Sequence, residues 1–321
     1  MRYRQLGRTG FNVSEIGFGA WGIGKQMWVG ADDKESLRAL HQAVDAGLNF
    51  IDTALAYGNG YSENLVGGFV KERKERIYVA TKVPPKNGVW PARGPLPEVF
   101  PPEYIIKCAE TSLRNLKVDT IDLLQLHVWD ASWFKEDSWY ETLRRLREQG
   151  KVTFFGISIN DHEPNSALEL VGSGKIDSVQ VIYNIFDQSP EDQLFPLCQE
   201  KNVGVIARVP FDEGALTGHI TPETKFAKKD WRNYYFKGER KQQVFERVEK
   251  LKQLLDGEEA GTLPELALKF CLSHPAVSTV IPGMRTAAHV GSNVGVSEAP
   301  RLSPDRMQKL RQHRWEKNFY S

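Results

Sequence analysis

The sequence contains few cysteines and no long apolar run. Its 321 residues include only Cys108, Cys198 and Cys271, which are odd in number and far apart. This number and spacing disfavour a disulfide framework and a thiolate metal site, so we expect no metal and three packed, free thiols in a reducing compartment. No segment approaches the roughly 18 apolar residues of a membrane helix, and Met1–Arg4 lacks the apolar core of a signal peptide. The sequence therefore predicts a cytoplasmic protein without membrane association.

The sequence also lacks an excess of either charge. Its 42 lysines and arginines balance 41 aspartates and glutamates, which leaves a net charge of +1. Such a surface does not attract nucleic acid or acidic lipid as a whole, so we expect neither as a partner. The 40% of hydrophobic and 26% of charged residues are ordinary for a globular protein. We expect a small-molecule substrate and a monomer or small homo-oligomer.

Short apolar runs alternate with helix-period segments along most of the chain. Eight runs rich in Val, Ile and Leu are expected as strands at 14–19, 49–52, 76–82, 120–127, 153–158, 178–183, 204–208 and 278–282. Helices are expected at 33–46, from 62 onward, and at 102–116, 138–149, 163–171, 190–201, 240–255 and 262–273. Continuous apolar strands are typical of a parallel sheet that helices cover. The pattern predicts an α/β fold, a (β/α)8 TIM barrel, with residues 1–321 as one domain and a hairpin cap at 3–13.

The glycines after the first expected strand do not favour an open dinucleotide-binding sheet. The segment Gly17-Phe18-Gly19-Ala20-Trp21-Gly22 has glycine spacing like that of the phosphate-binding fingerprint. The bulky Trp21 would crowd a pyrophosphate, however, and no helix is expected to begin there. The closed barrel therefore remains the favoured fold.

Polar side chains stand at the ends of three successive strands. Asp52 ends the second strand and Tyr57 follows it, while Lys82 ends the third strand and His127 the fourth. The carboxyl ends of barrel strands share one face, so these four side chains should converge on one mouth. Ser62 is expected to cap the helix that follows Tyr57.

These residue types suit the reduction of a carbonyl group. A phenol with an ordinary pKa of about 10 is protonated at neutral pH, so Tyr57 could protonate a developing alkoxide. The ammonium of Lys82 would make that phenol a better acid, and Asp52 would pair with the ammonium. His127 could hydrogen-bond the substrate oxygen or relay the proton. A positioned acid contributes only roughly 10²–10⁴-fold, so a cofactor must supply the harder step.

Each of these residues also has a structural interpretation when taken alone. Asp52 and Lys82 could form an ion pair that closes the barrel end. His127 could be a satisfied core histidine, and Tyr57 could anchor its loop. Four such groups at successive strand ends are less expected by accident, which favours the catalytic interpretation.

The motifs around these residues resemble those of the aldo-keto reductase superfamily, in its bacterial and plant-type branch, along nearly the whole chain. Asp52-Thr53-Ala54, Tyr57-Gly58, Gly60 and Ser62-Glu63 match the family's main signature. Thr81-Lys82-Val83 and Leu124-Gln125-Leu126-His127 match its other two catalytic positions. The resemblance implies that Tyr57 is the general acid/base, that Lys82 and Asp52 tune it, and that His127 orients the carbonyl.

The same resemblance implies a nicotinamide cofactor, NADPH, with NADH as the alternative. Ser158 or Asn160, together with Gln180, would hold the carboxamide. Arg208 stands where many members have an aromatic residue that stacks on the nicotinamide, and Arg285 suits an adenosine 2′-phosphate because Arg binds phosphate bidentately. The implied cofactor-binding residues are Trp21, Ser158, Asn160, Gln180, Arg208, Pro210, Gly214, Leu216, Gly283, Arg285, His289 and Asn293.

Long loops and tryptophans are expected around the mouth. Loops at 83–101 and 217–238 are long enough to act as lids. Three loop tryptophans follow the first, third and fourth strands: Trp21, Trp90 and Trp129. We expect them to form the walls of the substrate pocket, with packing of the loops as the structural alternative. The short aromatic tail at 314–320 is not expected to fold deeply over the mouth, which favours broad specificity.

These observations predict an NAD(P)H-dependent oxidoreductase that reduces aldehydes or ketones to alcohols, or works in reverse on sugars or alcohols. A nicotinamide-binding regulatory or redox-sensing subunit with little turnover is the alternative, since some relatives of this fold attach to ion channels. The intact set of four residues favours the enzyme.

Overall fold

The computed structural model describes residues 1–25, 28–91 and 93–320. The chain opens with an antiparallel hairpin of β1 (Tyr3–Gln5) and β2 (Asn12–Ser14). A 3-10 turn at Gly7–Thr9 joins the two strands, and Gly10 follows it in the left-handed region at φ 73°. The predicted hairpin is confirmed.

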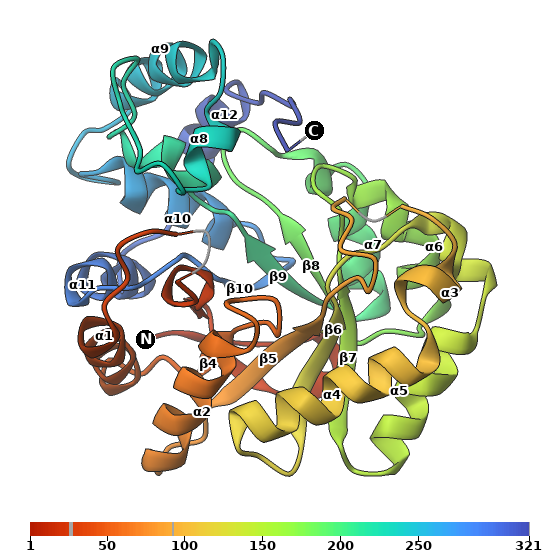
Figure 1. Ribbon diagram of the computed structural model, residues 1–321. Helices are drawn as coiled ribbons and strands as arrows, with labels where there is room; N and C mark the ends of the chain where they lie inside the picture. Colours follow the sequence, from red (N-terminus) through yellow and green to blue (C-terminus); the bar gives the residue numbers. More distant parts are fainter. Residues whose placement is uncertain (26–27, 92, 321) are drawn as a thin grey trace.

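Eight parallel strands form the centre of the fold (Figure 1). They are β3 (Phe18–Gly19), β4 (Phe50–Asp52), β5 (Tyr78–Val83), β6 (Ile121–Leu126), β7 (Val152–Ser158), β8 (Ser178–Ile182), β9 (Gly204–Arg208) and β10 (Val277–Val280). Each strand pairs with the next one along the chain. Bridges from Ile16 to Val280 and from Gly19 to Gly283 join the first strand to the last, so the sheet closes on itself. The closure requires glycine at position 19, because a Cβ there would lie 2.8 Å from the carbonyl oxygen of Ile281. The predicted barrel is confirmed.

Helices follow the strands and surround the sheet (Figure 1). Those at positions where the sequence pattern predicts helices are α1 (Asp33–Asp45), α2 (Tyr61–Glu72), α4 (Pro102–Leu116), α5 (Ser138–Glu148), α6 (Leu168–Ser173), α7 (Leu194–Lys201), α9 (Arg240–Lys252) and α10 (Leu263–Ser273). The others are α3 (Leu96–Val99), α8 (Arg232–Tyr235), α11 (Ala287–Val294) and α12 (Pro304–Arg311). The sequence pattern did not indicate α3, α8 or α12, which lie in loops or near the end of the described chain. Among the described residues, no helix has the length and apolarity needed to cross a membrane.

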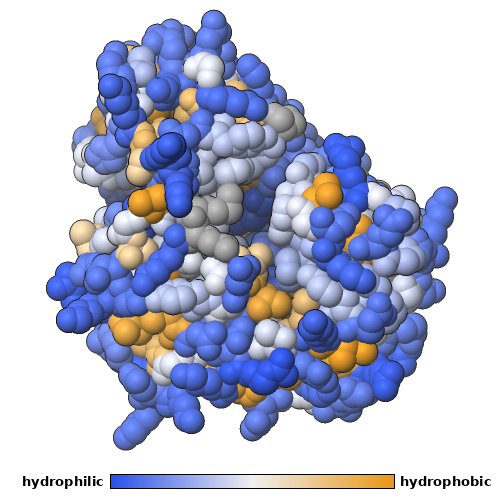
Figure 2. Space-filling view, viewed as in Figure 1, coloured by the Kyte–Doolittle hydropathy of each residue, from blue (hydrophilic) through white to orange (hydrophobic). Residues whose placement is uncertain are grey.

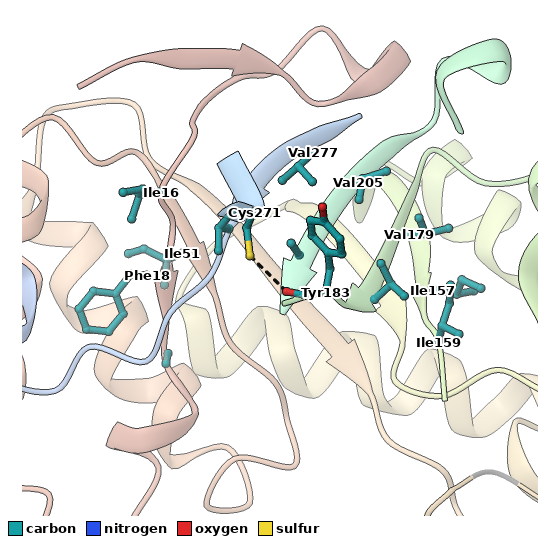
Figure 3. Close-up of a cluster of buried hydrophobic side chains, with 14 of the residues drawn as sticks. Ile16, Phe18, Ile51, Ile157, Ile159, Val179, Tyr183, Val205, Cys271 and Val277 are labelled. Atoms are coloured by element: carbon teal, nitrogen blue, oxygen red, sulfur yellow. Dashed lines mark hydrogen bonds between the residues drawn. The ribbon is translucent and has the colours of Figure 1, made fainter. Parts of the chain in front are cut away.

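Two layers of apolar side chains pack around and inside the barrel. The outer layer packs the strands against the helices; Figure 3 shows part of it, where the buried thiol of Cys271 donates to the carbonyl oxygen of Tyr183 across 3.3 Å. The inner layer fills the barrel and consists of Leu6, Val13, Phe50, Ala80, Leu123, Ile206 and Ile281. Two of its members come from the hairpin, which therefore closes the amino end of the barrel. All three cysteines are free and buried, as expected.

The expected cap of α2 is wrong. The helix begins at Tyr61, and Gly60 precedes it in the left-handed region at φ 88°, a conformation that glycine adopts without steric cost. The buried hydroxyl of Ser62 instead accepts a hydrogen bond from Thr53 (2.8 Å) and donates to the carbonyl of Ala20 (3.0 Å). Ser62 thus ties α2 to the ends of β3 and β4.

Several expected boundaries also shift. Ser14 belongs to the hairpin, so the first barrel strand is only Phe18–Gly19. The segments expected as helices at 163–171 and 190–201 each begin with a 3-10 turn, and α9 ends at Lys252 rather than at residue 255. These differences lie at element ends, where hydrogen bonding is least complete.

Candidate active site

A polar layer lies above the inner apolar layer, toward the carboxyl ends of the strands. Successive side chains of a strand point to opposite faces, so a residue two positions beyond an inward-facing residue also faces inward. Such pairs are Phe50 and Asp52, Ala80 and Lys82, Leu123 and Gln125, and Ile206 and Arg208. The alternation of the strands therefore brings these polar side chains to one end of the barrel.

Lys82 makes the central contacts of this layer. Its fully buried ammonium donates to Oδ1 of Asp52 (2.5 Å), to the carbonyl of Thr53 (2.7 Å) and to the phenol oxygen of Tyr57 (3.4 Å). Burial is the largest single effect and would lower the pKa of Lys82, but Asp52 and Tyr57 together outweigh it and leave this pKa raised. Lys82 therefore keeps its positive charge beside the phenol.

Tyr57 lies between this ammonium and two rings. Its ring stacks on Trp21 at a centroid distance of 6.2 Å, and the ring of His127 meets it edge-on at 5.7 Å. Burial raises the pKa of Tyr57, and the charge of Lys82 opposes this only in part. Lys82 was expected to lower the phenol's pKa, but burial has the larger effect here. Tyr57 is consequently protonated at neutral pH, as a proton donor must be.

His127 lies beside Tyr57 with a neutral ring. Burial holds the pKa of His127 well below its ordinary value, and the positive charges of Lys82 and Arg208 lower it further. Its Nδ1 atom is buried and has no hydrogen-bond partner among the described residues. A neutral imidazole carries one N–H, which can donate to a substrate oxygen. The predicted convergence of the four side chains at one mouth is confirmed.

The expected carboxamide residues adjoin this group. Ser158 and Gln180 pair in register on β7 and β8, and both are buried. The amide nitrogen of Gln180 donates to Oδ2 of Asp52 across 2.7 Å. Asn160, also buried, donates to Glu163 across 3.3 Å. The structure thus joins Gln180 directly to the Asp52 carboxylate.

Arg208 at the end of β9 is held in a fixed ion pair. Its Nη2 atom donates to Asp161 (2.7 Å) and to the carbonyl of Ile159 (3.0 Å). Burial is the largest single effect and would lower the pKa of Arg208, but Asp161, Tyr320 and Tyr57 together outweigh it and leave this pKa raised. Its Nε atom is buried, and no described residue accepts a hydrogen bond from it. A permanent cation therefore stands at the end of β9, where the sequence predicts a residue that stacks on the nicotinamide.

The segment after β9 turns through left-handed backbone. Val209, Glu213 and Gly214 have φ values of 56°, 55° and 102°, and Pro210 beside them is buried. Leu216 is fully buried, and its N–H donates to the carbonyl of Phe211 across 3.0 Å. The buried side chain and the bonded N–H of Leu216 help to fix this turn, and its contact with the cofactor stays a prediction.

The expected phosphate-binding residues gather near α11. The guanidinium of Arg285 is half-buried and donates to the carbonyl of Val29 (3.0 Å). Burial, followed by the nearby charge of Arg232, lowers the pKa of Arg285. Gly283 and His289 are exposed and Asn293 is buried. The helix begins just beyond Arg285, so its positive N-terminal end adds to the field of the guanidinium.

Two of the three expected substrate tryptophans lie beside the group of four. Trp21 stacks on Tyr57, and the ring of Trp90, which is 47% exposed, meets His127 edge-on at 4.8 Å. Trp129 was wrongly expected there. It is fully buried against Trp139, with a centroid distance of 5.2 Å, and its indole N–H donates to the carbonyl of Ser166. The packing interpretation therefore holds for Trp129.

The segment after α12 reaches the mouth, contrary to expectation. The hydroxyl of Tyr320 donates to Glu213 across 2.6 Å, and its ring stacks on Trp231 at 5.8 Å. Trp231 lies in turn 6.2 Å from Trp21, so the tail joins the aromatic wall beside Tyr57. The chain ends near α8 and α12 in Figure 1, and Figure 2 shows the surface hollowed below this region. Burial raises the pKa of Glu213 to about 7. The aromatic content of 314–320 was the only available signal, and no pattern indicated Glu213.

The charged groups of this mouth do not form a metal centre. Within the described part of the chain, no cluster of three or more His, Cys, Asp or Glu side chains could hold a metal ion. The phenol, ammonium and imidazole that converge here can transfer protons and bind anions and polar ligands.

Comparisons with known proteins agree on one family. The model of the Aldo/keto reductase family matches residues 15–314. Aldo-keto reductase YhdN of Bacillus subtilis is 30% identical over 89% of this chain and 85% of its own length. A probable voltage-gated potassium channel subunit beta of Arabidopsis thaliana is 30% identical over 97% of this chain and 96% of its own. The holo form of aldo-keto reductase AKR11C1 from Bacillus halodurans superimposes with a TM-score of 0.77 at 30% identity, covering 100% of both chains.

Proposed function

This chain belongs to the aldo/keto reductase family and is, with that family, an oxidoreductase; on this basis we propose that it reduces aldehydes or ketones with NADPH and that Tyr57 is its general acid. In the reverse direction it would oxidise sugars or other alcohols, with Tyr57 as the base. The free, buried cysteines support a reducing compartment such as the cytoplasm.

One observation carries this proposal: the ammonium of Lys82 contacts both the Asp52 carboxylate (2.5 Å) and the Tyr57 phenol (3.4 Å). A structural ion pair would need only the first contact. The second places a permanent positive charge where a phenolate would form, and such a charge stabilises the anion. This arrangement supports a phenol that gives up its proton during the reaction.

The side chains can then complete the reduction as follows. When bound, the nicotinamide supplies a hydride to the carbonyl carbon. Tyr57 gives its proton to the oxygen, which becomes the hydroxyl of the alcohol. Lys82 stabilises the remaining phenolate, and Asp52 holds Lys82 in place. The neutral ring of His127 donates its N–H to the same oxygen and orients the carbonyl.

The donor set at the mouth suits a dinucleotide phosphate. Gln180, Asn160 and Ser158 offer the amide and hydroxyl groups that a carboxamide needs. Arg208 carries a buried Nε atom without a partner in the described structure, so a hydrogen-bond acceptor can be received there. Arg285, with the N-terminal end of α11 beside it, would hold the 2′-phosphate that distinguishes NADPH from NADH.

The proposal is tested by incubating the purified protein with NADPH and a panel of aldehydes, ketones and quinones while the absorbance of reduced nicotinamide is followed. NADP⁺ with sugars and alcohols tests the reverse direction. We expect turnover with several aldehydes and its near-complete loss in Tyr57→Phe. Tyr61→Phe is the matched control, since this tyrosine contacts Asp33 on the surface. Absence of turnover across the panel, or equal rates for Tyr57→Phe and the unaltered protein, would contradict the proposal.

A second candidate function has one specific observation in its favour. The Arabidopsis relative, which matches over nearly the full length of both chains, bears the name of a potassium channel subunit. A regulatory subunit of this kind would bind NADPH tightly and release its products slowly. Single-turnover measurements separate the two candidates: a rapid first turnover followed by negligible steady-state rate supports the subunit, whereas sustained turnover supports the enzyme.

A further inference from the structure

The guanidinium of Arg208 spans one strand of the barrel. Its Nη2 atom reaches from the end of β9 to the segment after β7, where it donates to the carbonyl of Ile159 (3.0 Å) and to Asp161 (2.7 Å). Strand β8 lies between β7 and β9, and its Gln180 pairs in register with the inward-facing Ile206, two positions before Arg208. The cation therefore crosses the inner side of β8 in the layer above the amide proposed to hold the carboxamide.

The positive end of this ion pair faces the reacting groups. The charge of Arg208 lowers the pKa of His127, and it opposes the burial that raises the pKa of Tyr57. Both charges that shift the pKa of His127, those of Lys82 and Arg208, are positive. Asp161 thus balances Arg208 from its far side, and the guanidinium stands between this carboxylate and the mouth.

The charge of a nicotinamide ring changes when it gives up its hydride. The reduced ring is neutral, and the oxidised ring is a cation. A hydride donor must lie within about 3–3.5 Å of the carbonyl carbon that it reduces. The oxygen on that carbon receives its proton from Tyr57 under the proposed function, so the ring has to lie among the groups that the charge of Arg208 reaches. A buried cation repels the oxidised ring and leaves the neutral ring unaffected.

We propose that Arg208 makes this site select the redox state of its cofactor, because its positive charge weakens the binding of NADP⁺ relative to NADPH. Asp161 limits the effect by neutralising part of that charge. The inference rests on the proposed function, since it requires a nicotinamide in this mouth. Oxidised cofactor then leaves more readily after a carbonyl has been reduced. The potential of the bound couple rises by about 30 mV for each tenfold by which NADPH is preferred.

Isothermal titration calorimetry of the whole protein, with NADPH and NADP⁺ in separate titrations, tests the proposal. The measured quantity is the ratio of the two dissociation constants, in which every contact common to both forms cancels. We expect NADPH to bind the unaltered protein about tenfold more tightly than NADP⁺. Arg208→Gln removes the charge and should bring the two affinities together, whereas Arg208→Lys keeps the charge and should preserve most of the preference.

Asp161→Asn should change the ratio in the opposite direction. This substitution removes the balancing carboxylate, while the carbonyl of Ile159 still holds the guanidinium in place. The preference for NADPH should therefore increase by a few fold. A structural role of the ion pair alone would weaken the binding of both forms and leave their ratio unchanged.

Arg285→Ala is the matched control, because the 2′-phosphate that it is proposed to bind is present in both forms. This variant should weaken both affinities alike. An unchanged ratio in Arg208→Gln, or a smaller preference for NADPH in Asp161→Asn, would overturn the inference and leave the proposed function intact. Failure of both forms to bind the unaltered protein would contradict the proposed function and this inference together. If Arg208→Gln does not fold, the direction of the change in Asp161→Asn still decides.

Discussion

The side-chain amide of Gln180 and the carboxylate of Asp52 are joined by a hydrogen bond of 2.7 Å, from Nε2 to Oδ2. Asp52 therefore binds Lys82 through one oxygen and Gln180 through the other. The residue proposed to hold the carboxamide thus also fixes the carboxylate that orients the ammonium. Cofactor binding and the acidity of Tyr57 should be linked through this carboxylate.

We expect Gln180→Leu to raise the KM for NADPH and to lower kcat, since both the carboxamide contact and the support of Asp52 are lost. Gln125→Leu is the matched control, because Gln125 also faces Oδ2 of Asp52 but only at 3.5 Å. Steady-state kinetics with both variants measure the difference. Similar effects of the two substitutions would show that Gln180 has no special role in cofactor binding.

Removing Lys82 should destabilise the fold strongly. Lys82→Met leaves the buried Asp52 carboxylate without its cation, which we expect to cost about 3–5 kcal/mol of unfolding free energy. The double variant Asp52→Asn/Lys82→Met should lose less than the sum of the two single variants. Urea denaturation followed by fluorescence measures all three.

Lys25→Met serves as the surface comparison, because Lys25 pairs with Asp33 across 2.8 Å with both side chains about 40% exposed. Such pairs contribute at most about 1 kcal/mol. A cost for Lys82→Met no greater than that for Lys25→Met would contradict a buried ion pair.

The pH dependence of the reaction should differ between its two directions. Reduction needs the protonated phenol of Tyr57, and burial raises the pKa of that phenol above its ordinary value of about 10. The reduction rate should therefore stay level as the pH rises through neutrality, whereas oxidation, which needs the phenolate, should become faster. His127 is neutral because its pKa lies well below the ordinary value of about 6.5, so no step is expected near that pH. Single-turnover rates in both directions measure these profiles, and a reduction rate that falls between about pH 6 and 8 would be inconsistent with them.

Glu213 should make stability depend on pH in a defined window. Burial raises its pKa to about 7 in the folded state, compared with roughly 4.3 in an unfolded chain. A raised folded-state pKa contributes stability that is fully present below the unfolded pKa and is lost as the pH rises through the folded one. Relative to Glu213→Gln, the unaltered protein should therefore lose unfolding free energy between about pH 4.3 and 7 and then remain level. Parallel pH curves for the two proteins would show that Glu213 does not titrate as expected.

Arg285 should decide the choice between the two cofactors. Arg285→Ala should raise the KM for NADPH by about tenfold or more, through the loss of a charge-assisted phosphate contact, and should leave the KM for NADH nearly unchanged. The matched control is Arg232→Ala, since Arg232 lies near Arg285 but is engaged with Asp230 (2.8 Å). If Arg285→Ala changes both KM values alike, the 2′-phosphate is not bound by this residue.

The sequence alone determined the barrel and the group of four. Most strands are apolar runs, and β4, β5, β6 and β9 each carry a polar residue two positions beyond an inward-facing apolar one, as with Phe50 and Asp52. Both features depend on residue order and on the alternation of side chains along a strand, so they can be seen without coordinates. The free, buried cysteines followed from composition in the same way.

Tertiary structure decided whatever depends on contacts between distant segments. Trp129 and Trp90 both lie in loops, yet Trp129 is buried and Trp90 is exposed. The difference arises because Trp129 packs against the ring of Trp139 in α5. Tyr320 reaches Glu213 across 107 positions of chain, and burial there rather than residue type raises the pKa of the carboxyl group. Local sequence patterns determine which face of a strand or helix a side chain occupies. Its burial and its contacts with distant residues depend on how the whole chain packs.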